Sequence, residues 1–123
     1  MICLDALHPR VVADFWCAVL DWVVVEEDVD GIGIGIGIAP VDGTGPRIDV
    51  FQVPERKTVK NRLHLDLRAD GSSTADELAR LLALGATRAD VGQGSDVTWT
   101  VLADPEGNEF CLLSRPVQEL PSV

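Results

Sequence analysis

The feature that most constrains this fold is an order of predicted elements that occurs twice along the chain. Each half contains a strand, a helix and three further strands, and the halves span about residues 1–54 and 61–115. Neither half is long enough to bury the apolar face of its own sheet, so we expect the two halves to complete each other. The sequence therefore predicts a single α+β domain of tandem βαβββ modules over residues 1–116, with 116–123 as a C-terminal tail.

The first half opens with an alternating strand and an amphipathic helix. Residues 2–6 alternate, which places Cys3 and Asp5 on the face opposite the apolar residues. Pro9 suits the first turn of a helix, apolar residues follow at helical spacing, and Asp21 is placed to end the helix in a left-handed conformation. The other strands of this half are predicted at residues 22–25, 31–38 and 47–53.

Residues 31–38 are four consecutive Gly-Ile pairs. In a strand, the isoleucines would cover one face and the glycines would leave the other face bare. Glycine in a strand often marks the close approach of another backbone or a ligand. A permissive edge strand with a weakly specified register explains the run more simply. We also expect the acidic residues 26–28 to end the strand that precedes this run.

The second half is predicted from the same signals. An amphipathic helix is expected over 74–84, with Thr74 and Glu77 at capping-box spacing and Gly85 placed to end it. Its buried stripe is predicted to comprise Leu78, Leu81 and Leu82. The later strands of this half are expected at 87–91, 97–102 and 109–114, with a tight turn at 104–107.

The strand that opens the second half carries the main functional candidate. From Asn61 to Arg68, apolar and polar residues alternate, so His64 and Asp66 share one polar face. A polar row that points inward needs a reason, and the simplest reason is a pocket. His64 is the most reactive side chain of that row.

Composition excludes several classes of partner. The net charge of −10 disfavours nucleic acid and anionic membranes, because both bind cationic surfaces. The sequence shows no membrane span and no signal peptide, so we expect a soluble, cytoplasmic protein. Half of the ten Lys and Arg residues fall within 56–68, which indicates either a solvated loop or a rim that attracts an anionic small molecule. The three cysteines lack C-x-x-C spacing, which favours reduced thiols over a disulfide or a zinc knuckle.

Together with the paired modules, four motifs resemble the vicinal oxygen chelate superfamily of glyoxalases, bleomycin-resistance proteins and extradiol dioxygenases. They are Phe15-Trp16-x-x-x-Leu20-x-Trp22, Phe51-Gln52-Val53-Pro54-Glu55, the stretch from Lys60 to Leu67, and Asp104-Pro105-Glu106-Gly107-Asn108-Glu109-Phe110. The chain is most similar to small glyoxalase-like domains. The resemblance implies half-barrel sheets that open on one concave site, and it implies no particular reaction.

The resemblance also implies which positions face that site, because metal-using members place ligands on the first and last strands of each half. His64 takes the second-half ligand position. An interpretation of His64 as a hydrogen-bonded residue of the pocket wall is equally well supported. Cys111 takes the last-strand position, and Glu109 lies one step earlier on the same face. The first-strand position falls at Cys3 or Met1. The implied pocket residues are Cys3, Asp5, Gln52, His64, Asp66, Glu109 and Cys111.

This set departs from the metal enzymes. A hard ion such as Mg²⁺ or Mn²⁺ prefers oxygen ligands, whereas these positions supply an imidazole, the amide of Gln52 and thiols. Zinc would accept Cys3, His64 and Cys111 and keep one open position. The simpler interpretation is that both cysteines are small, half-buried apolar residues. We therefore expect no metal, and a divalent ion bound among His64, Gln52, Cys3 and Cys111 is the alternative.

Three functions are compatible with the sequence. The first is a homodimeric, metal-independent protein that binds a small organic molecule, oriented by His64, Gln52 and Glu109. The second is a glyoxalase-like lyase or isomerase with a divalent metal, in which Glu109 and His64 are the candidate catalytic residues. The third is an assembly domain with a vestigial pocket. Trp16 and Trp99 either line the pocket or belong to the core.

Overall fold

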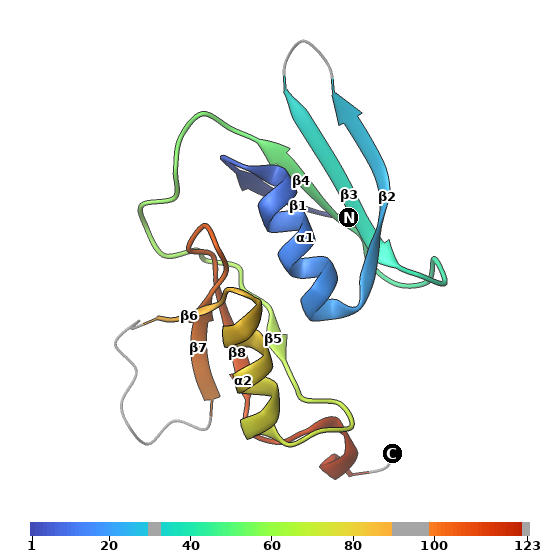
Figure 1. Cartoon of the computed structure of the whole chain (residues 1–123), viewed down its shortest axis with the longest axis vertical. Helices are drawn as coiled ribbons and strands as arrows, with labels where there is room; N and C mark the ends of the chain where they lie inside the picture. Colours follow the sequence, from blue (N-terminus) through green and yellow to red (C-terminus); the bar gives the residue numbers. More distant parts are fainter. Residues whose placement is uncertain (30–32, 90–98, 122–123) are drawn as a thin grey trace. The chain divides into compact units, whose positions relative to one another are not determined.

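The computed structural model describes residues 1–29, 33–89 and 99–121. The chain divides into two units, Met1–Thr58 and Val59–Val123. Each unit contains one α-helix and a sheet of four strands in the order β-α-β-β-β (Figure 1), which confirms the predicted α+β fold of tandem βαβββ modules. No helix among the described residues has both the length and the apolar character that a membrane span requires.

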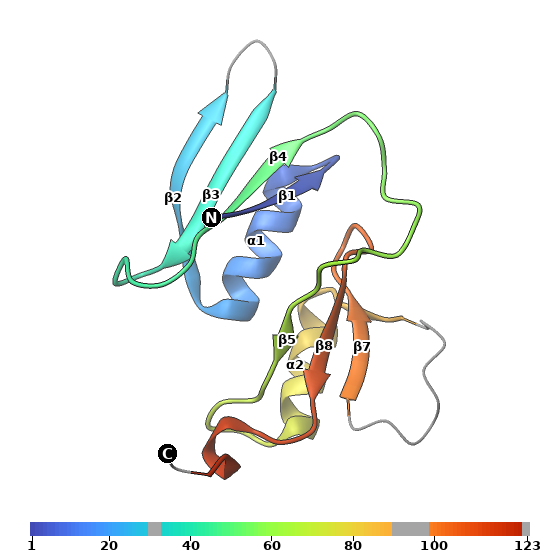
Figure 2. The same cartoon turned by 180° about the vertical axis from the view of Figure 1, so that it is seen from behind.

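The first unit packs one helix on one face of its sheet. Its elements are β1 (Ile2–Ala6), α1 (Pro9–Leu20), β2 (Trp22–Val29), β3 (Ile34–Pro40) and β4 (Ile48–Gln52). The strand order is β1-β4-β3-β2, in which β1 and β4 are parallel and the other neighbours are antiparallel. The helix lies in front of the sheet in Figure 1 and behind it in Figure 2, and it contacts all four strands.

Helix α1 forms where the sequence predicts it. Pro9 occupies its first turn, and Asp21 ends it with a φ of 56°, a left-handed conformation that short polar side chains tolerate. Its buried face presents Phe15 and Trp16, whose rings meet edge to face with centroids 5.2 Å apart. The sheet contributes Ile36, Ile38 and Val50 to the same core. Trp16 is therefore a core residue.

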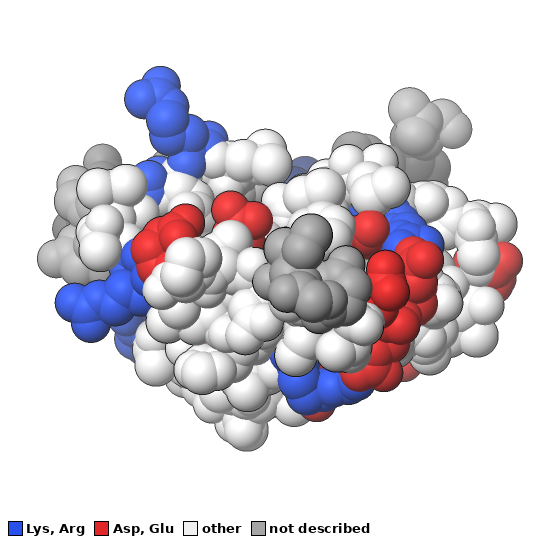
Figure 3. Space-filling model, turned by 90° about the horizontal axis from the view of Figure 1, so that it is seen from above, with Lys and Arg blue, Asp and Glu red and all other residues white. Residues whose placement is uncertain are grey.

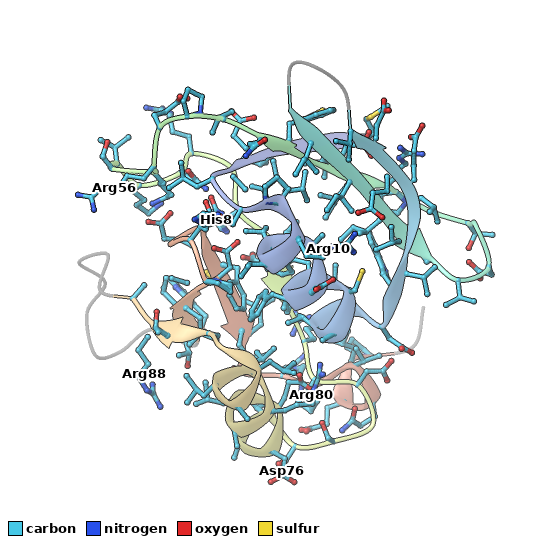
Figure 4. The ribbon with its side chains drawn as sticks, turned by 45° about the horizontal axis from the view of Figure 1, so that its top comes forward. His8, Arg10, Arg56, Asp76, Arg80 and Arg88 are labelled. Atoms are coloured by element: carbon cyan, nitrogen blue, oxygen red, sulfur yellow. The ribbon has the colours of Figure 1, made fainter. Side chains whose placement is uncertain are left out.

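The prediction that the acidic residues 26–28 end β2 is wrong, because the strand continues to Val29. β2 is an edge strand, so its acidic side chains reach solvent and find basic partners there. On the face drawn in Figure 3, acidic side chains accordingly lie beside basic ones. Glu26 pairs with Arg47, and Glu27 pairs with Arg10, which Figure 4 labels on α1.

The prediction of an edge strand for the Gly-Ile run is also wrong. Within the described part of the run, β3 lies between β4 and β2, and residues 30–32 lie outside the described residues. A Cβ on Gly37 would stand 2.5 Å from Nη2 of Arg47, and a Cβ on Gly35 would stand 3.2 Å from the ring of Phe51. The bare face therefore gives room to two large side chains of the same unit, and not to the backbone or ligand considered from the sequence.

The second unit repeats this architecture. Its elements are β5 (Asp66–Leu67), α2 (Thr74–Leu84), β6 (Thr87–Arg88), β7 (Trp99–Ala103), β8 (Glu109–Leu113) and a short 3₁₀ helix (Val117–Glu119). The strand order is β5-β8-β7-β6, and β5 and β8 are parallel. Helix α2 lies in front of β8 in Figure 1 and behind it in Figure 2. Parts of the strands predicted at 87–91 and 97–102 lie outside the described residues.

Helix α2 has the predicted bounds but a different N-cap. The hydroxyl of Ser73 accepts a hydrogen bond from the backbone N–H of Asp76 at 3.0 Å, which makes Ser73 the capping residue. The hydroxyl of Thr74, the predicted cap, instead donates to the carbonyl of Ser114. Gly85 ends the helix with a φ of 119°, as predicted.

Two other expectations for this unit are wrong. The strand predicted from Asn61 to Arg68 is reduced to β5, because residues 61–65 lack regular strand geometry. One hydrogen bond, from the Cys111 N–H to the Leu65 carbonyl at 2.9 Å, continues the contact with β8. In α2, Leu81 is buried but Leu82 is exposed, because adjacent helical positions point in directions about 100° apart.

The C-terminal segment is hydrogen-bonded to the loop before α2. The N–H of Val117 donates to the carbonyl of Ala69 at 2.8 Å. The side chain of Gln118 accepts from the N–H of Gly71 at 3.1 Å and donates to the carbonyl of Ser72 at 2.9 Å. The residues predicted as a tail therefore hold the loop that positions the start of the helix.

Candidate functional site

Alternation along β7 and β8 gives the second sheet one buried face and one open face. Phe110 of β8 is fully buried on the side of α2, so its neighbours in the strand point the other way. On that open face, Cys111 pairs with Val101 of β7, and Leu113 pairs with Trp99. These four side chains form a continuous surface on two adjacent strands.

A cavity of about 300 Å³ lies on this open face. It is lined by Lys60, His64, Asp66, Trp99, Val101, Glu109, Cys111 and Leu113. Its apolar wall comes from the indole of Trp99 and the aliphatic side chains beside it, and its polar wall comes from the two carboxylates, the imidazole and the ammonium. All the lining residues belong to the second unit.

Three donor groups meet at the polar wall of the cavity. Nδ1 of His64 lies 3.0 Å from Oδ1 of Asp66. Asp66 is the register partner of Cys111 across β5 and β8, and its carboxylate accepts a hydrogen bond from the thiol. One nitrogen, one oxygen and one sulfur atom of the three residues lie within 4.8 Å of one another. The side chains of His64 and Asp66 are 40% and 48% exposed, whereas Cys111 is only 8% exposed.

The environment of Cys111 keeps its thiol protonated. Burial raises the pKa of this thiol, the negative charge and the hydrogen bond of Asp66 raise it further, and the Lys60 ammonium opposes them. A thiol with a raised pKa has a small thiolate fraction at neutral pH. Cys111 is therefore a poor nucleophile in this setting.

Glu109 connects the cavity to the segment that precedes β5. Its Oε1 accepts a hydrogen bond from the backbone N–H of Asn61 at 3.0 Å. The amide of Asn61 donates to Oδ1 of Asn108 at 2.8 Å, and Asn108 in turn donates to Oδ2 of Asp104 at 2.9 Å. Asn108 and Asp104 are both buried, so this chain of bonds fixes the position of the segment.

The basic segment 56–68 contributes little of its charge to the cavity. Among the described residues, Lys60 is its one basic side chain in the cavity lining. Arg56 extends away from the ribbon in Figure 4, and Arg68 donates to the carbonyl of Arg115 at 2.8 Å. Of the predicted cationic rim, therefore, only the Lys60 ammonium lines the cavity among the described residues.

Three of the predicted pocket residues, Cys3, Asp5 and Gln52, belong to the first unit. Cys3 and Asp5 are exposed on β1, where their register partners in β4 are Asp49 and Phe51. Gln52 is the last residue of β4, and its exposed side chain lies beside Gly33. Asp49 and Phe51 thus share one sheet face with Cys3 and Asp5. The other four predicted pocket residues, His64, Asp66, Glu109 and Cys111, meet at the cavity of the second unit.

The donor chemistry of the polar wall suits a borderline metal ion better than a hard one. An imidazole nitrogen, a carboxylate oxygen and a thiolate sulfur are all ligands that zinc accepts in four-coordinate sites. Mg²⁺ and Mn²⁺ prefer more oxygen ligands than this wall offers. The predicted trio of Cys3, His64 and Cys111 spans both units, whereas His64, Asp66 and Cys111 meet within one.

Two cavity residues, Lys60 and Trp99, and the neighbouring Asn61 did not emerge clearly from the sequence. Trp99 was left open between core and cavity, and its alternation with the buried Leu102 could have placed it outward. Lys60 and Asn61 precede the regular strand, so periodicity gives no orientation for their side chains. Lys60 and Asn61 are positioned by the contact that the chain before β5 makes with β8.

Comparisons with known proteins agree on the fold. A family model described as glyoxalase-like domain matches residues 1–113. The fosfomycin resistance protein FosX of Listeria monocytogenes superposes with a TM-score of 0.70 at 12% identity, covering 96% of this chain and 91% of that one. FosX of Mesorhizobium loti gives a TM-score of 0.68 at 13% identity over the same shares of both chains. TnmS3 of Streptomyces sp. CB03234, an antibiotic binding protein, gives 0.52 at 16% identity, covering 91% and 90%.

No curated protein matches the chain significantly in sequence. At such low identities the solved structures support the fold and no activity. The family model, however, covers nearly the whole chain, and it agrees with the repeated βαβββ order and with the shared fold. The chain therefore belongs to the glyoxalase-like domain family, within the vicinal oxygen chelate superfamily.

Proposed function

We propose that this protein binds a small organic molecule in the cavity of its second unit. The observation that carries the proposal is the division of the cavity into an apolar wall and a polar wall. The apolar wall consists of Trp99, Val101 and Leu113. The polar groups lie on the other side of Cys111. Ligand pockets in proteins typically combine an apolar lining with a few placed polar groups in this way.

The size of the cavity limits the ligand. About 300 Å³ is at the lower end of the range for small-molecule sites, which favours a compact molecule with one ring or a short branched chain. Its apolar part would contact the exposed indole of Trp99. Its polar part would meet the ring nitrogen of His64 and the ammonium of Lys60, which together offer hydrogen bonds to an oxygen-bearing group.

Proteins of the same fold supply a precedent for binding. TnmS3 is described as an antibiotic binding protein, and FosX as a fosfomycin resistance protein. The fold thus accommodates small organic molecules in other chains. Which ligand this chain binds depends on the residues that line its own cavity. The homodimer and the cytoplasmic location expected from the sequence remain predictions.

A compound screen tests the proposal. Metal-free protein is screened against a library of small organic molecules by thermal shift, and the affinities of hits are measured by calorimetry. Trp99→Ala and His64→Ala are expected to weaken each true hit by about tenfold or more, because each removes a wall of the cavity. Trp22→Phe, in the first unit, is the control and should leave the affinity unchanged. Hits that bind both cavity variants as tightly as wild type would contradict the proposed site.

A second candidate function is the metal-dependent lyase or isomerase reaction. The observation that favours it is the meeting of His64, Asp66 and Cys111, which gives three donors to a divalent ion. A bound ion would polarise adjacent oxygens of a substrate as a Lewis acid. A FosX structure was determined with Mn(II) and sulfate, so the fold holds a metal in another chain. Elemental analysis of protein purified without an affinity tag or chelator tests this candidate, and a metal-free result would count against it.

A further inference from the structure

The polar wall of the cavity carries more negative than positive charge. Asp66 and Glu109 contribute two carboxylates, and Lys60 contributes the one ammonium among the described lining residues. Hydrogen bonds within the wall hold both carboxylates, one to the ring of His64 and the other to the N–H of Asn61. An anionic ligand would therefore have to give up its water beside negative charges that are fixed in place.

The contact between His64 and Asp66 determines what the imidazole offers to a ligand. Nδ1 lies 3.0 Å from Oδ1 of Asp66. An ionised carboxylate only accepts hydrogen bonds, so Nδ1 carries the ring proton in the neutral imidazole. The other nitrogen, Nε2, then carries a lone pair, and His64 lines the cavity with 40% of its side chain exposed. The imidazole therefore offers Nε2 as a hydrogen-bond acceptor.

Lys60 supplies the complementary donor. Its Nζ donates to the carbonyl of Asn61 at 3.4 Å, and an ammonium has three N–H groups in all. A single hydroxyl group would use both partners, because its O–H donates to Nε2 of His64 while its oxygen accepts from Lys60. A carboxylate or an ether has no proton for Nε2, and a ligand ammonium would meet the like charge of Lys60.

We propose that the cavity selects uncharged ligands that carry a hydroxyl group on a compact apolar body, and that it discriminates against the corresponding carboxylates. The inference rests on the proposed function, because it names the class of ligand for the same cavity. The apolar body would lie against Trp99, Val101 and Leu113, which form the other wall. An aromatic ring suits this wall, because it packs well on the face or edge of an indole.

The exposure of the polar wall sets the size of the expected preference. A closed site that is built to hydrogen-bond a hydroxyl rejects an analogue without that group by a factor of about 10⁴ or more. In this cavity the side chains of His64 and Asp66 are 40% and 48% exposed, so water reaches both groups and reduces the penalty for a mismatched ligand. We therefore expect a preference of about tenfold.

Four compounds with the same ring test the inference: 4-methylphenol, 4-methylbenzoate, 4-methylanisole and 4-methylbenzylamine. Each is titrated into metal-free, ¹⁵N-labelled protein at about pH 8, where the phenol is uncharged and the benzoate is ionised. The backbone amide signals of Val101 and Cys111 report binding. We expect the phenol to bind at least about tenfold more tightly than each of the other three.

The outcomes separate this inference from the proposed function. A benzoate, anisole or benzylamine that binds as tightly as the phenol would overturn the inference and leave binding of a small molecule in this cavity intact. If none of the four compounds binds, the selection for a hydroxyl group is also wrong, and the library screen decides separately whether the cavity binds ligands of another class.

Variants assign the preference to individual side chains. His64→Phe keeps a ring but removes the acceptor, so the phenol should lose its advantage over the anisole. Asp66→Asn removes a negative charge, so the preference for the phenol over the benzoate should fall by about tenfold. A change that only loosens the cavity would weaken both ligands of a pair equally, so an unchanged ratio in both variants would overturn the inference.

The role of Lys60 is tested against a neighbouring lysine. Lys60→Met should weaken binding of the phenol by about threefold or more, because the hydroxyl oxygen loses its donor. Lys57→Met removes the same charge from the same segment at a position outside the cavity lining, and it should leave the affinity unchanged. Equal effects of the two substitutions would contradict a direct contact with Lys60. Circular dichroism of each variant confirms that it is folded.

Discussion

The guanidinium of Arg47 lies against the backbone of Gly37, so that a Cβ at position 37 would stand 2.5 Å from Nη2 and 2.8 Å from Cζ. Nε of Arg47 contacts Oδ1 of Asp49 at 2.5 Å, and Nη2 pairs with Glu26 of β2. Arg47 therefore links β4 to β2 across the strand that separates them. Only a residue without a side chain at position 37 leaves space for this link.

Gly37→Ala is expected to destabilise the protein by about 1–2 kcal/mol. The added methyl group would displace the guanidinium and leave Asp49, which is 8% exposed, without its ionic partner. Chemical denaturation measures the change. Gly35→Ala is the matched control on the same strand and should cost less, because the ring of Phe51 is partly exposed and can turn away. Equal costs for the two variants would contradict this account.

A double-mutant cycle separates the clash from the loss of the ion pairs. If the methyl group acts through Arg47, Gly37→Ala should cost much less in an Arg47→Ala background than in wild type. The same denaturation experiment gives the coupling free energy. Additive effects of the two substitutions would mean that Gly37 is needed for another reason.

Ser73→Ala is expected to lower stability by about 1 kcal/mol, because it removes the N-cap hydrogen bond to Asp76. Ser72→Ala, one residue earlier, is the control and should be nearly neutral. Thermal unfolding of both variants decides whether the helix starts as the structure shows. No loss of stability in Ser73→Ala would contradict Ser73 as the capping residue.

Asp104→Asn is expected to cost about 1–3 kcal/mol. Oδ1 of Asp104 accepts from the N–H groups of Glu106 and Asn108, and Oδ2 accepts from the Asn108 amide. An asparagine amide in either orientation turns one acceptor into a donor at a buried position.

Asp42→Asn is the control for Asp104→Asn at an exposed position. Asp42 makes a similar turn, in which its Oδ1 accepts from both the N–H and the hydroxyl of Thr44. Because water can replace a lost partner there, Asp42→Asn should change the unfolding free energy much less than Asp104→Asn does. A comparable loss at both positions would show that burial is not the deciding factor.

The reactivity of Cys17 should be low at neutral pH and should rise in alkali. Burial raises the pKa of the Cys17 thiol, and the negative charge of Asp14 raises it further, although Arg10 opposes them. Cys17 of the folded protein should therefore alkylate more slowly at neutral pH than Cys17 of denatured protein, and its rate should rise in alkali. Mass spectrometry after timed treatment with iodoacetamide measures both rates, and denatured protein provides the reference.

The raised pKa of the Cys17 thiol also makes the stability of the protein depend on pH. The folded protein holds the Cys17 proton more tightly than the unfolded chain does, so the stabilisation is complete below the pKa of the unfolded thiol and is lost as the pH rises through the folded value. Wild type should therefore lose more stability between neutral and alkaline pH than Cys17→Ala does. Parallel curves for the two proteins would contradict the raised pKa.

Local signals in the sequence predicted the order of the elements and the bounds of both α-helices. Pro9 and Asp21 bracket α1, and Gly85 ends α2, because each residue has a backbone preference that does not depend on distant contacts. Alternation likewise placed Cys3 and Asp5 on one face of β1 and Glu109 and Cys111 on one face of β8. Periodicity within a single segment is enough for such assignments.

The tertiary structure decided which segments lie beside one another. Alternation shows which face a side chain occupies, but it does not show which strand is the neighbour, because strand pairing depends on contacts far apart in the sequence. The place of β3 inside its sheet, the fit of Arg47 over Gly37 and the meeting of Asp66 with Cys111 all follow from such pairing. The sequence by itself thus determined the two βαβββ modules, and the parallel register of β5 and β8 decided that the imidazole, carboxylate and thiol share one wall of the cavity.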